Sequence, residues 1–320
     1  MSDPVTVTTQ LPMHRAVPFR NSVGLDLLPT DVPYIARFRM AAHAGFAGVE
    51  MEVVASPDEA AEVHAAALSA GLTIHSVLAP ENWRFPLSSA DPAEVRRCLA
   101  ALYTALGNAK RWGADTLLLI PAVVNASTSY LDAYKRSQAV IRGELIPAAQ
   151  EHGVLLGIEN VWNGFLLGPL EYVRYIDELE SPWVRAYLDV GNMFLSRPED
   201  WIRVAGRRVV KLHMKDLRVD LVHGRFRFGR IGDGDVDWQA VRRALIDIGF
   251  AGFITSTGVP RRRISRTLAG WQRRLRSSDR ASLVRALAAV KRRADERFLR
   301  DVAQRFVRFR DGQPFAASGS

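Results

Sequence analysis

Short apolar runs alternate with longer amphipathic stretches between residues 21 and 256. A short apolar run fits a buried strand, whereas a longer stretch with apolar positions three and four residues apart fits a helix that packs on one face. Strands and helices that alternate in this way form a parallel sheet. The pattern predicts eight strands, at Ser22–Leu27, Gly48–Val53, Thr73–Leu78, Thr116–Pro121, Val154–Glu159, Val184–Asp189, Val209–His213 and Gly252–Ser256.

The stretches between these strands carry the start and stop signals of helices. Ser56 and Asp91 each precede a proline, which is typical of an N-cap followed by the first helical turn. Gly71, Gly113 and Gly153 follow amphipathic stretches and predict their C-terminal ends. The predicted helices include Ser56–Ala70, Asp91–Trp112, Tyr130–His152, Gly168–Leu179 and Asp237–Ile248.

Eight strand–helix units favour an α/β fold closed into a (β/α)8 TIM barrel. Such a barrel takes about 250 residues, so the 320 residues of this chain allow one barrel and an appendage. Residues 1–20 have no apolar core of the kind found in a secretory signal, and we expect an irregular lead-in there. The sequence contains no apolar run of membrane-spanning length. Cys98 is the single cysteine, at a predicted core position, which indicates a protein of the reducing cytoplasm.

The net charge of +9 is distributed unevenly along the chain. Residues 261–310 contain 17 of the 43 Lys and Arg residues but four of the 34 Asp and Glu residues. The rest of the chain is mildly acidic. The basic character therefore belongs to one C-terminal segment and not to the predicted barrel.

Polar side chains stand where the predicted strands end. Strand 2 runs into Glu50 and Glu52, strand 3 carries His75, and strands 5, 6 and 7 end in Glu159, Asp189 and His213. Barrel enzymes place their active groups at the C-terminal ends of strands, so the last three side chains should converge above the barrel. Charged groups there are costly unless they are paired or bind a metal. Two carboxylates and an imidazole suit Mn²⁺, Mg²⁺, Co²⁺ or Zn²⁺, and we predict a site for a divalent metal.

Four motifs occur in order along the second half of the chain. They are Gly157-Ile158-Glu159-Asn160, Tyr187-Leu188-Asp189-Val190-Gly191-Asn192, Lys211-Leu212-His213-Met214-Lys215-Asp216 and Gly232-Asp233-Gly234-Asp235-Val236-Asp237-Trp238. With Ile74-His75-Ser76 and the segment around Pro80-Glu81-Asn82-Trp83, they resemble the sugar phosphate isomerase/epimerase family of xylose-isomerase-like barrels. The resemblance spans about residues 22–256.

The resemblance implies a divalent metal, Mn²⁺ first, held by Glu159, Asp189, His213 and a last Glu that ends strand 8. Glu159 would also act as catalytic acid and base, because a metal beside two ketose oxygens lowers the pKa of the neighbouring C–H group. In the epimerase branch the first and last Glu face opposite sides of that carbon. The same mapping gives His75, Asn192, Lys215 and Arg230 as substrate contacts.

The sequence departs from the family at strand 8. The last Glu should fall near Thr257, where the chain has no carboxylate. A hydroxyl is a weak ligand and a poor base at neutral pH. The departure removes both a metal ligand and one of two proton-transfer groups.

The basic segment follows this point directly. Residues 295–301 resemble the helix that normally closes the barrel, so we interpret residues 257–294 as a basic, helical insertion and residues 21–256 with 295–310 as the barrel domain. Clusters of arginine could bind nucleic acid or acidic lipid. Aromatic residues that could stack on bases are sparse there, and we do not expect nucleic-acid binding or a membrane partner.

The sequence therefore predicts a metal-dependent isomerase or epimerase of a small sugar or sugar phosphate, with activity impaired by the loss of the strand-8 Glu. Two alternatives stay open. One is a barrel that binds sugar and metal without catalysis, and the other is a dehydratase of the inosose type at the same site. A multi-metal endonuclease of this barrel class would need more His ligands at strand ends than the chain offers. A homo-oligomer is compatible with the sequence.

Overall fold

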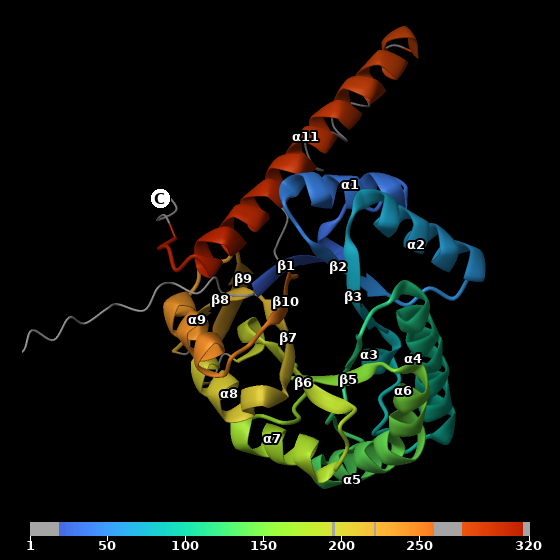
Figure 1. The fold of residues 1–320 in the computed structure, drawn as a ribbon, viewed down its shortest axis with the longest axis vertical. Helices are drawn as coiled ribbons and strands as arrows, with labels where there is room; N and C mark the ends of the chain where they lie inside the picture. The colour runs from blue at the N-terminus through green and yellow to red at the C-terminus, as the bar shows by residue number, and fades with distance from the viewer. Residues whose placement is uncertain (1–18, 194–195, 221, 259–276, 316–320) are drawn as a thin grey trace, which may run out of the picture.

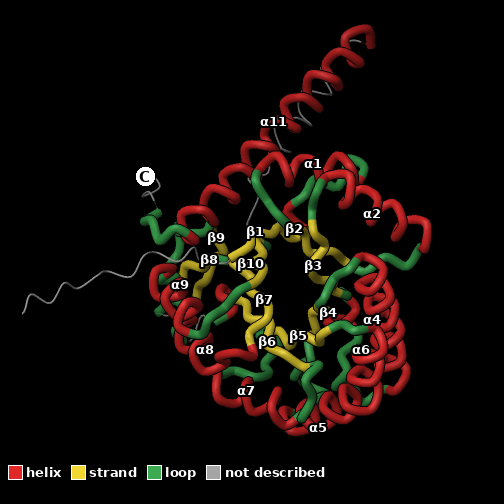
Figure 2. Tube along the Cα trace, in the orientation of Figure 1, coloured by secondary structure: helices red, strands yellow, loops and turns green. Residues whose placement is uncertain are grey.

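The eight predicted strands close into a parallel barrel. The computed structural model describes residues 19–193, 196–220, 222–258 and 277–315. Around the ring the strands follow the order β1-β10-β7-β6-β5-β4-β3-β2 (Figure 2). Their bounds are β1 Phe19–Gly24, β2 Gly48–Glu52, β3 Thr73–Leu78, β4 Thr116–Leu119, β5 Leu155–Glu159, β6 Val184–Asp189, β7 Val209–Met214 and β10 Gly252–Ser256. The predicted TIM barrel is confirmed.

Helices surround the ring of strands, as Figure 1 shows. They are α1 Tyr34–Ala44, α2 Pro57–Ala70, α3 Glu81–Arg84, α4 Pro92–Trp112, α5 Tyr130–Val140, α6 Ile146–His152, α7 Pro169–Glu178, α8 Pro198–Ala205, α9 Trp238–Asp247 and α11 Ser277–Arg310. A π-helical stretch, η2 (Ile141–Leu145), joins α5 to α6, and the short 3-10 turns are η1 Leu25–Leu27, η3 Val190–Asn192 and η4 Gly206–Arg208.

The local signals at the helix ends act as the sequence predicts. The Ser56 side chain accepts a hydrogen bond from the Glu59 amide, and the Asp91 carboxylate accepts one from the Ala93 amide, so both cap otherwise unpaired N–H groups. Gly113 ends α4 in the left-handed conformation at φ 73°, which glycine adopts without steric cost. Each helix thus returns the chain to the start of the next strand.

A two-stranded antiparallel hairpin in the loop after β7 is absent from the sequence prediction. It consists of β8 (Asp216–Asp220) and β9 (Arg225–Gly229). Trp162, in the loop after β5, packs against Phe226 and Phe228 of β9 with ring centroids 4.3 Å and 5.3 Å apart. The hairpin therefore lies over the same end of the barrel as the C-terminal ends of β5 and β7.

The C-terminal helix α11 closes the barrel beside β1. Phe309 is buried, and its ring stacks on Phe19 at the start of β1 with centroids 5.9 Å apart. The opposite end of α11 extends beyond the barrel (Figure 1). The boundary predicted at residues 294 and 295 falls inside this continuous helix, and residues 259–276 of the predicted insertion lie outside the described residues. Among the described ranges, no helix combines the length and apolar character needed to cross a bilayer.

Candidate active site and metal centre

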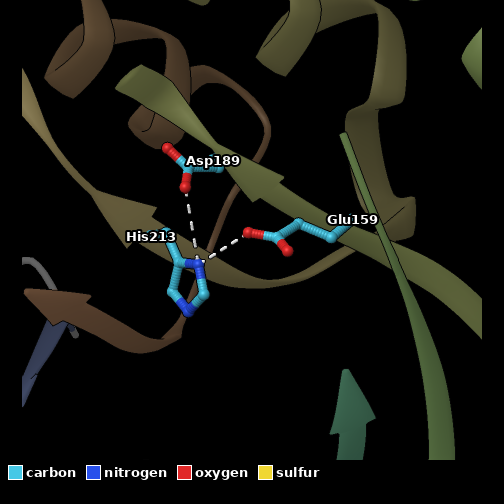
Figure 3. A group of neighbouring side chains, drawn as sticks. All are labelled: Glu159, Asp189 and His213. Carbon is cyan, nitrogen blue, oxygen red and sulfur yellow. Dashed lines mark hydrogen bonds and ion pairs between the residues drawn. The ribbon is translucent and has the colours of Figure 1, made fainter. Parts of the chain in front are cut away.

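Glu159, Asp189 and His213 meet at the C-terminal end of the barrel. Glu159 ends β5, Asp189 ends β6, and His213 lies beside Asp189 in the register of β6 with β7. The His213 Nδ1 atom is 2.8 Å from Glu159 Oε1 and 3.6 Å from Asp189 Oδ2 (Figure 3). All three side chains are buried, and one potential ligand atom from each lies within 4.8 Å of the others.

Glu50 of β2 contacts the other nitrogen of the same imidazole. His213 Nε2 is 2.7 Å from Glu50 Oε1, while Glu50 Oε2 accepts hydrogen bonds from Ser76 and from the Tyr187 hydroxyl, the latter at 2.5 Å. When Glu50 accepts a hydrogen bond from Nε2–H, the proton of the neutral imidazole stays on Nε2. The lone pair on Nδ1 then faces Glu159 and Asp189, as a metal-bound histidine requires. The sequence prediction placed Glu50 at a strand end but did not include it in the site.

The opposing charges set the protonation of these buried groups. Burial raises the pKa of Glu50, but the charge and hydrogen bond of His213 outweigh it and hold the pKa at about 2. Burial lowers the pKa of His213, yet Glu50 and Glu159 raise it well above its ordinary value. Burial raises the pKa of Glu159, and His213 offsets only part of that effect. Glu159 is therefore a stronger base than a carboxylate in water.

Lys215 provides Asp189 with a positive partner. Its ammonium lies 2.5 Å from Asp189 Oδ2, and the Gly191 amide donates to Asp189 Oδ1 at 2.9 Å. Burial raises the pKa of Asp189, but Lys215 and His213 together bring it below its ordinary value. Asp189 is thus fixed as an anion pointing at the cluster.

Asn160 joins the two motifs that end β5 and β6. Its side-chain oxygen accepts from the Asp189 amide at 2.8 Å, and its amide nitrogen donates to the Asp189 carbonyl at 3.0 Å. Asn192 donates to the Asn160 carbonyl at 2.9 Å. These paired bonds hold Glu159 and Asp189 in a fixed relation, and Asn192 also lines an adjacent open pocket of about 280 Å³.

Asp216 organises the glycine-rich turn that follows the hairpin. Its buried carboxylate accepts hydrogen bonds from the Gly232 amide at 2.6 Å, the Gly234 amide at 3.1 Å and the Trp238 indole at 3.0 Å. The motif of residues 232–238 therefore directs two backbone amides and one indole N–H group at a single carboxylate.

The remaining predicted substrate contacts, His75 and Arg230, have hydrogen-bond or ion-pair partners other than the three predicted ligands. His75 is buried inside the barrel, where it contacts the Ser22 hydroxyl at 2.7 Å and stacks on Phe253. Arg230 faces Asp301 of α11 at 3.6 Å. A substrate role for either residue stays a prediction.

Thr257 follows β10, at the position expected for the last Glu. Its hydroxyl donates to Asp26 Oδ1 at 3.1 Å, and the Gly258 amide donates to Asp26 Oδ2 at 2.8 Å. Asp26 lies in η1, directly after β1. A carboxylate from a distant part of the sequence therefore lies beside the position that lacks one.

The buried charges fit a divalent cation. Glu50, Glu159 and Asp189 carry three negative charges when ionised, and Lys215 compensates one of them. A proton on His213 would balance one of the two remaining negative charges, whereas a divalent cation would balance both. Carboxylate oxygens and an imidazole nitrogen are also the donors that Mn²⁺, Mg²⁺, Co²⁺ and Zn²⁺ accept.

Comparison with known proteins shows the family to which this fold belongs. Residues 38–279 match the model of the xylose isomerase-like TIM barrel family, and the chain belongs to that family. Over 240 residues it is 24% identical to a protein of Escherichia coli strain K12 named "Putative L-ribulose-5-phosphate 3-epimerase SgbU". The aligned region covers 70% of this chain and 83% of that protein.

Solved structures of sugar epimerases share the fold. The D-allulose 3-epimerase of a Methylomonas species superposes with a TM-score of 0.66 at 20% identity, over 92% of this chain and 97% of that chain. The D-psicose 3-epimerase of Clostridium cellulolyticum H10 gives a TM-score of 0.68 at 18% identity, over 91% and 98%. At these identities the likeness establishes the shared fold.

Proposed function

We propose that this protein is a metal-dependent epimerase or isomerase that acts on a small ketose or ketose phosphate. The observation that carries the proposal is the convergence of the buried side chains of Glu159, Asp189 and His213 at the C-terminal end of the barrel. The names of the relatives described above are those of 3-epimerases of a ketose or a ketose phosphate, which supports the same chemistry here.

Glu159, Asp189 and His213 would hold the divalent ion, and we propose Mn²⁺. The ion would supply the positive charge that makes the C–H group beside the ketose carbonyl acidic. Glu159 removes that proton, because Glu50 is held by Ser76, Tyr187 and His213, and Asp189 is paired with Lys215. Glu50 keeps the His213 ring oriented. Lys215 and Asn192 would donate hydrogen bonds to the hydroxyl groups of the sugar, a role supported by the contact of Lys215 with Asp189 and by the pocket that Asn192 lines.

Product analysis tests this proposal. The protein is loaded with Mn²⁺ and incubated with a panel of ketoses and ketose phosphates, and products are separated by chromatography. We expect an epimer or an aldose isomer from at least one substrate, and no product with Glu159→Gln. Glu62→Gln, on the exposed face of α2, is the matched control and should retain activity. A dehydrated product would instead indicate an inosose-type dehydratase.

A second candidate function is a barrel that binds sugar and metal without turnover, and the absence of a carboxylate at Thr257 favours it. Binding of a ketose in calorimetry, with no product from any substrate, would support this candidate over the enzyme. In that case Thr257→Glu should introduce activity, because it restores a carboxylate at the end of β10.

A further inference from the structure

Asp26 occupies the space beside the position where the strand-8 Glu is missing. Both of its carboxylate oxygens accept hydrogen bonds from the end of β10, one from the Thr257 hydroxyl and one from the Gly258 amide. Gly24 leaves room for this arrangement, because a Cβ there would lie 2.4 Å from Asp26 Oδ1 and 3.2 Å from Thr257 Oγ1. A side chain at this position would therefore displace the Asp26 carboxylate or the Thr257 hydroxyl from this arrangement.

The barrel order places Asp26 across the mouth from Glu159. Asp26 follows β1 and Glu159 ends β5, and these strands are four places apart in a ring of eight. Figure 2 shows β1 and β5 on opposite sides of the ring. Two carboxylates on opposite sides of the mouth can approach opposite faces of a carbon held between them.

Asp26 is also close to the cluster of buried charges. A Cβ on Gly258 would lie 2.9 Å from Lys215 Cε, so the Lys215 side chain passes directly over the residue whose amide binds Asp26. The same lysine reaches Asp189 at 2.5 Å. Unlike Glu159, Asp26 is exposed, so a substrate entering the mouth can reach it.

We propose that Asp26 is the second proton-transfer group of the epimerisation and takes the place of the strand-8 Glu, an inference that rests on the function proposed above. In one direction Glu159 removes the proton, and the C–H electron pair forms the carbon–carbon double bond of an enediolate. Asp26 in its acid form then donates a proton to the opposite face, and the electron pair returns to that carbon. In the reverse direction the two carboxyl groups exchange roles, so no oxidant or reductant is needed.

Asp26→Asn tests the proposal through an asymmetry between the two epimers. Each epimer is incubated in D2O with the Mn²⁺-loaded protein, and deuterium at the reacting carbon is measured by NMR. The variant should exchange the epimer whose hydrogen faces Glu159 and lose exchange of the other. Interconversion should fall about 10²–10⁴-fold, the usual contribution of a positioned acid or base. The ketose dissociation constant from calorimetry should change less than about threefold.

Three further variants make the result specific. Asp31→Asn removes a nearby exposed carboxylate that pairs with Lys291, and should behave as wild type. Adding Thr257→Glu to Asp26→Asn should restore part of the lost exchange. Glu52→Gln removes the carboxylate that ends β2, the neighbour of β1, and should retain exchange of both epimers.

Wild-type interconversion in Asp26→Asn would overturn the role of Asp26 and leave the proposed function standing. Loss of the second exchange in Glu52→Gln, with Asp26→Asn unaffected, would also overturn it and assign the proton transfer to Glu52. If the wild-type protein exchanges no ketose at all, the proposed function itself fails.

Discussion

At the scale of single residues, the imidazole of His213 is the group that contacts all three buried carboxylates of the site. Its Nδ1 faces Glu159 and Asp189, and its Nε2 faces Glu50. Sequence patterns predicted the first two neighbours because all three side chains stand at the ends of successive strands. Glu50 could not be predicted in the same way, because it reaches His213 across the barrel, 163 residues away in sequence.

Removing the charge of Glu50 should weaken metal binding without removing a ligand. In Glu50→Gln the Nε2 proton loses its anionic acceptor, so the His213 ring is less well oriented and less basic. Changes to such supporting groups typically cost about 10–100-fold in metal affinity. Calorimetric titration with Mn²⁺ measures the effect, with Glu62→Gln as control. Equal affinities in Glu50→Gln and wild type would show that Glu50 does not orient the ligand.

Cys98 should be inert in the folded protein. It is buried in α4, burial raises the pKa of its thiol to about 12, and the thiolate is the reactive form. A disulfide reagent at pH 8 should therefore label the native protein far more slowly than the protein in denaturant. Equally fast labelling in both states would place Cys98 outside the core.

At the scale of elements, the predicted and observed barrel strands differ mainly at β1. The prediction extended this strand to Leu27, whereas it ends at Gly24 and continues as η1. Leu27 is buried in this turn, so its apolar character could not distinguish a strand from a turn. The difference affects function, because η1 is the element that positions Asp26.

The β8–β9 hairpin was not predicted from the sequence, for a different reason. Its strand β9 alternates Arg225, Phe226, Arg227 and Phe228, but the phenylalanines pack on Trp162 of another loop instead of a sheet core. A search for buried parallel strands does not detect such a short, exposed pair. The contact that holds this hairpin comes from the loop after β5, which is distant in sequence.

The turn bound by Asp216 should tolerate no side chain at Gly234. A Cβ there would lie 2.0 Å from Asp216 Oδ1 and 2.7 Å from the Leu217 carbonyl oxygen. Gly234→Ala should lower the free energy of unfolding by about 1–3 kcal/mol, the usual effect of forcing atoms into a packed site. Chemical denaturation measures it. Gly229→Ala, whose Cβ would have no neighbour within 4 Å, is the control, and equal stability of the two variants would contradict this account of the turn.

At the scale of the whole molecule, the metal should stabilise the barrel. The proposed ligands come from β5, β6 and β7, so unfolding separates them. A ligand that binds only the folded protein, at a concentration 100 times its dissociation constant, adds about 2.7 kcal/mol to the free energy of unfolding. Thermal unfolding with Mn²⁺ and with a chelator should differ accordingly. Asp189→Asn should remove most of this difference, and a full metal effect in that variant would exclude Asp189 as a ligand.

The central claim is that Glu159 moves a proton on a ketose held at this cluster. The most direct measurement is deuterium incorporation, by NMR, into the recovered ketose after incubation with Mn²⁺-loaded protein in D2O. The account predicts deuterium incorporation at the carbon beside the carbonyl with the wild-type protein and with Glu62→Gln. With Glu159→Gln it predicts no incorporation on the face of that carbon that Glu159 approaches. Undiminished incorporation in Glu159→Gln, or none in the wild-type protein with any ketose of the panel, would contradict it.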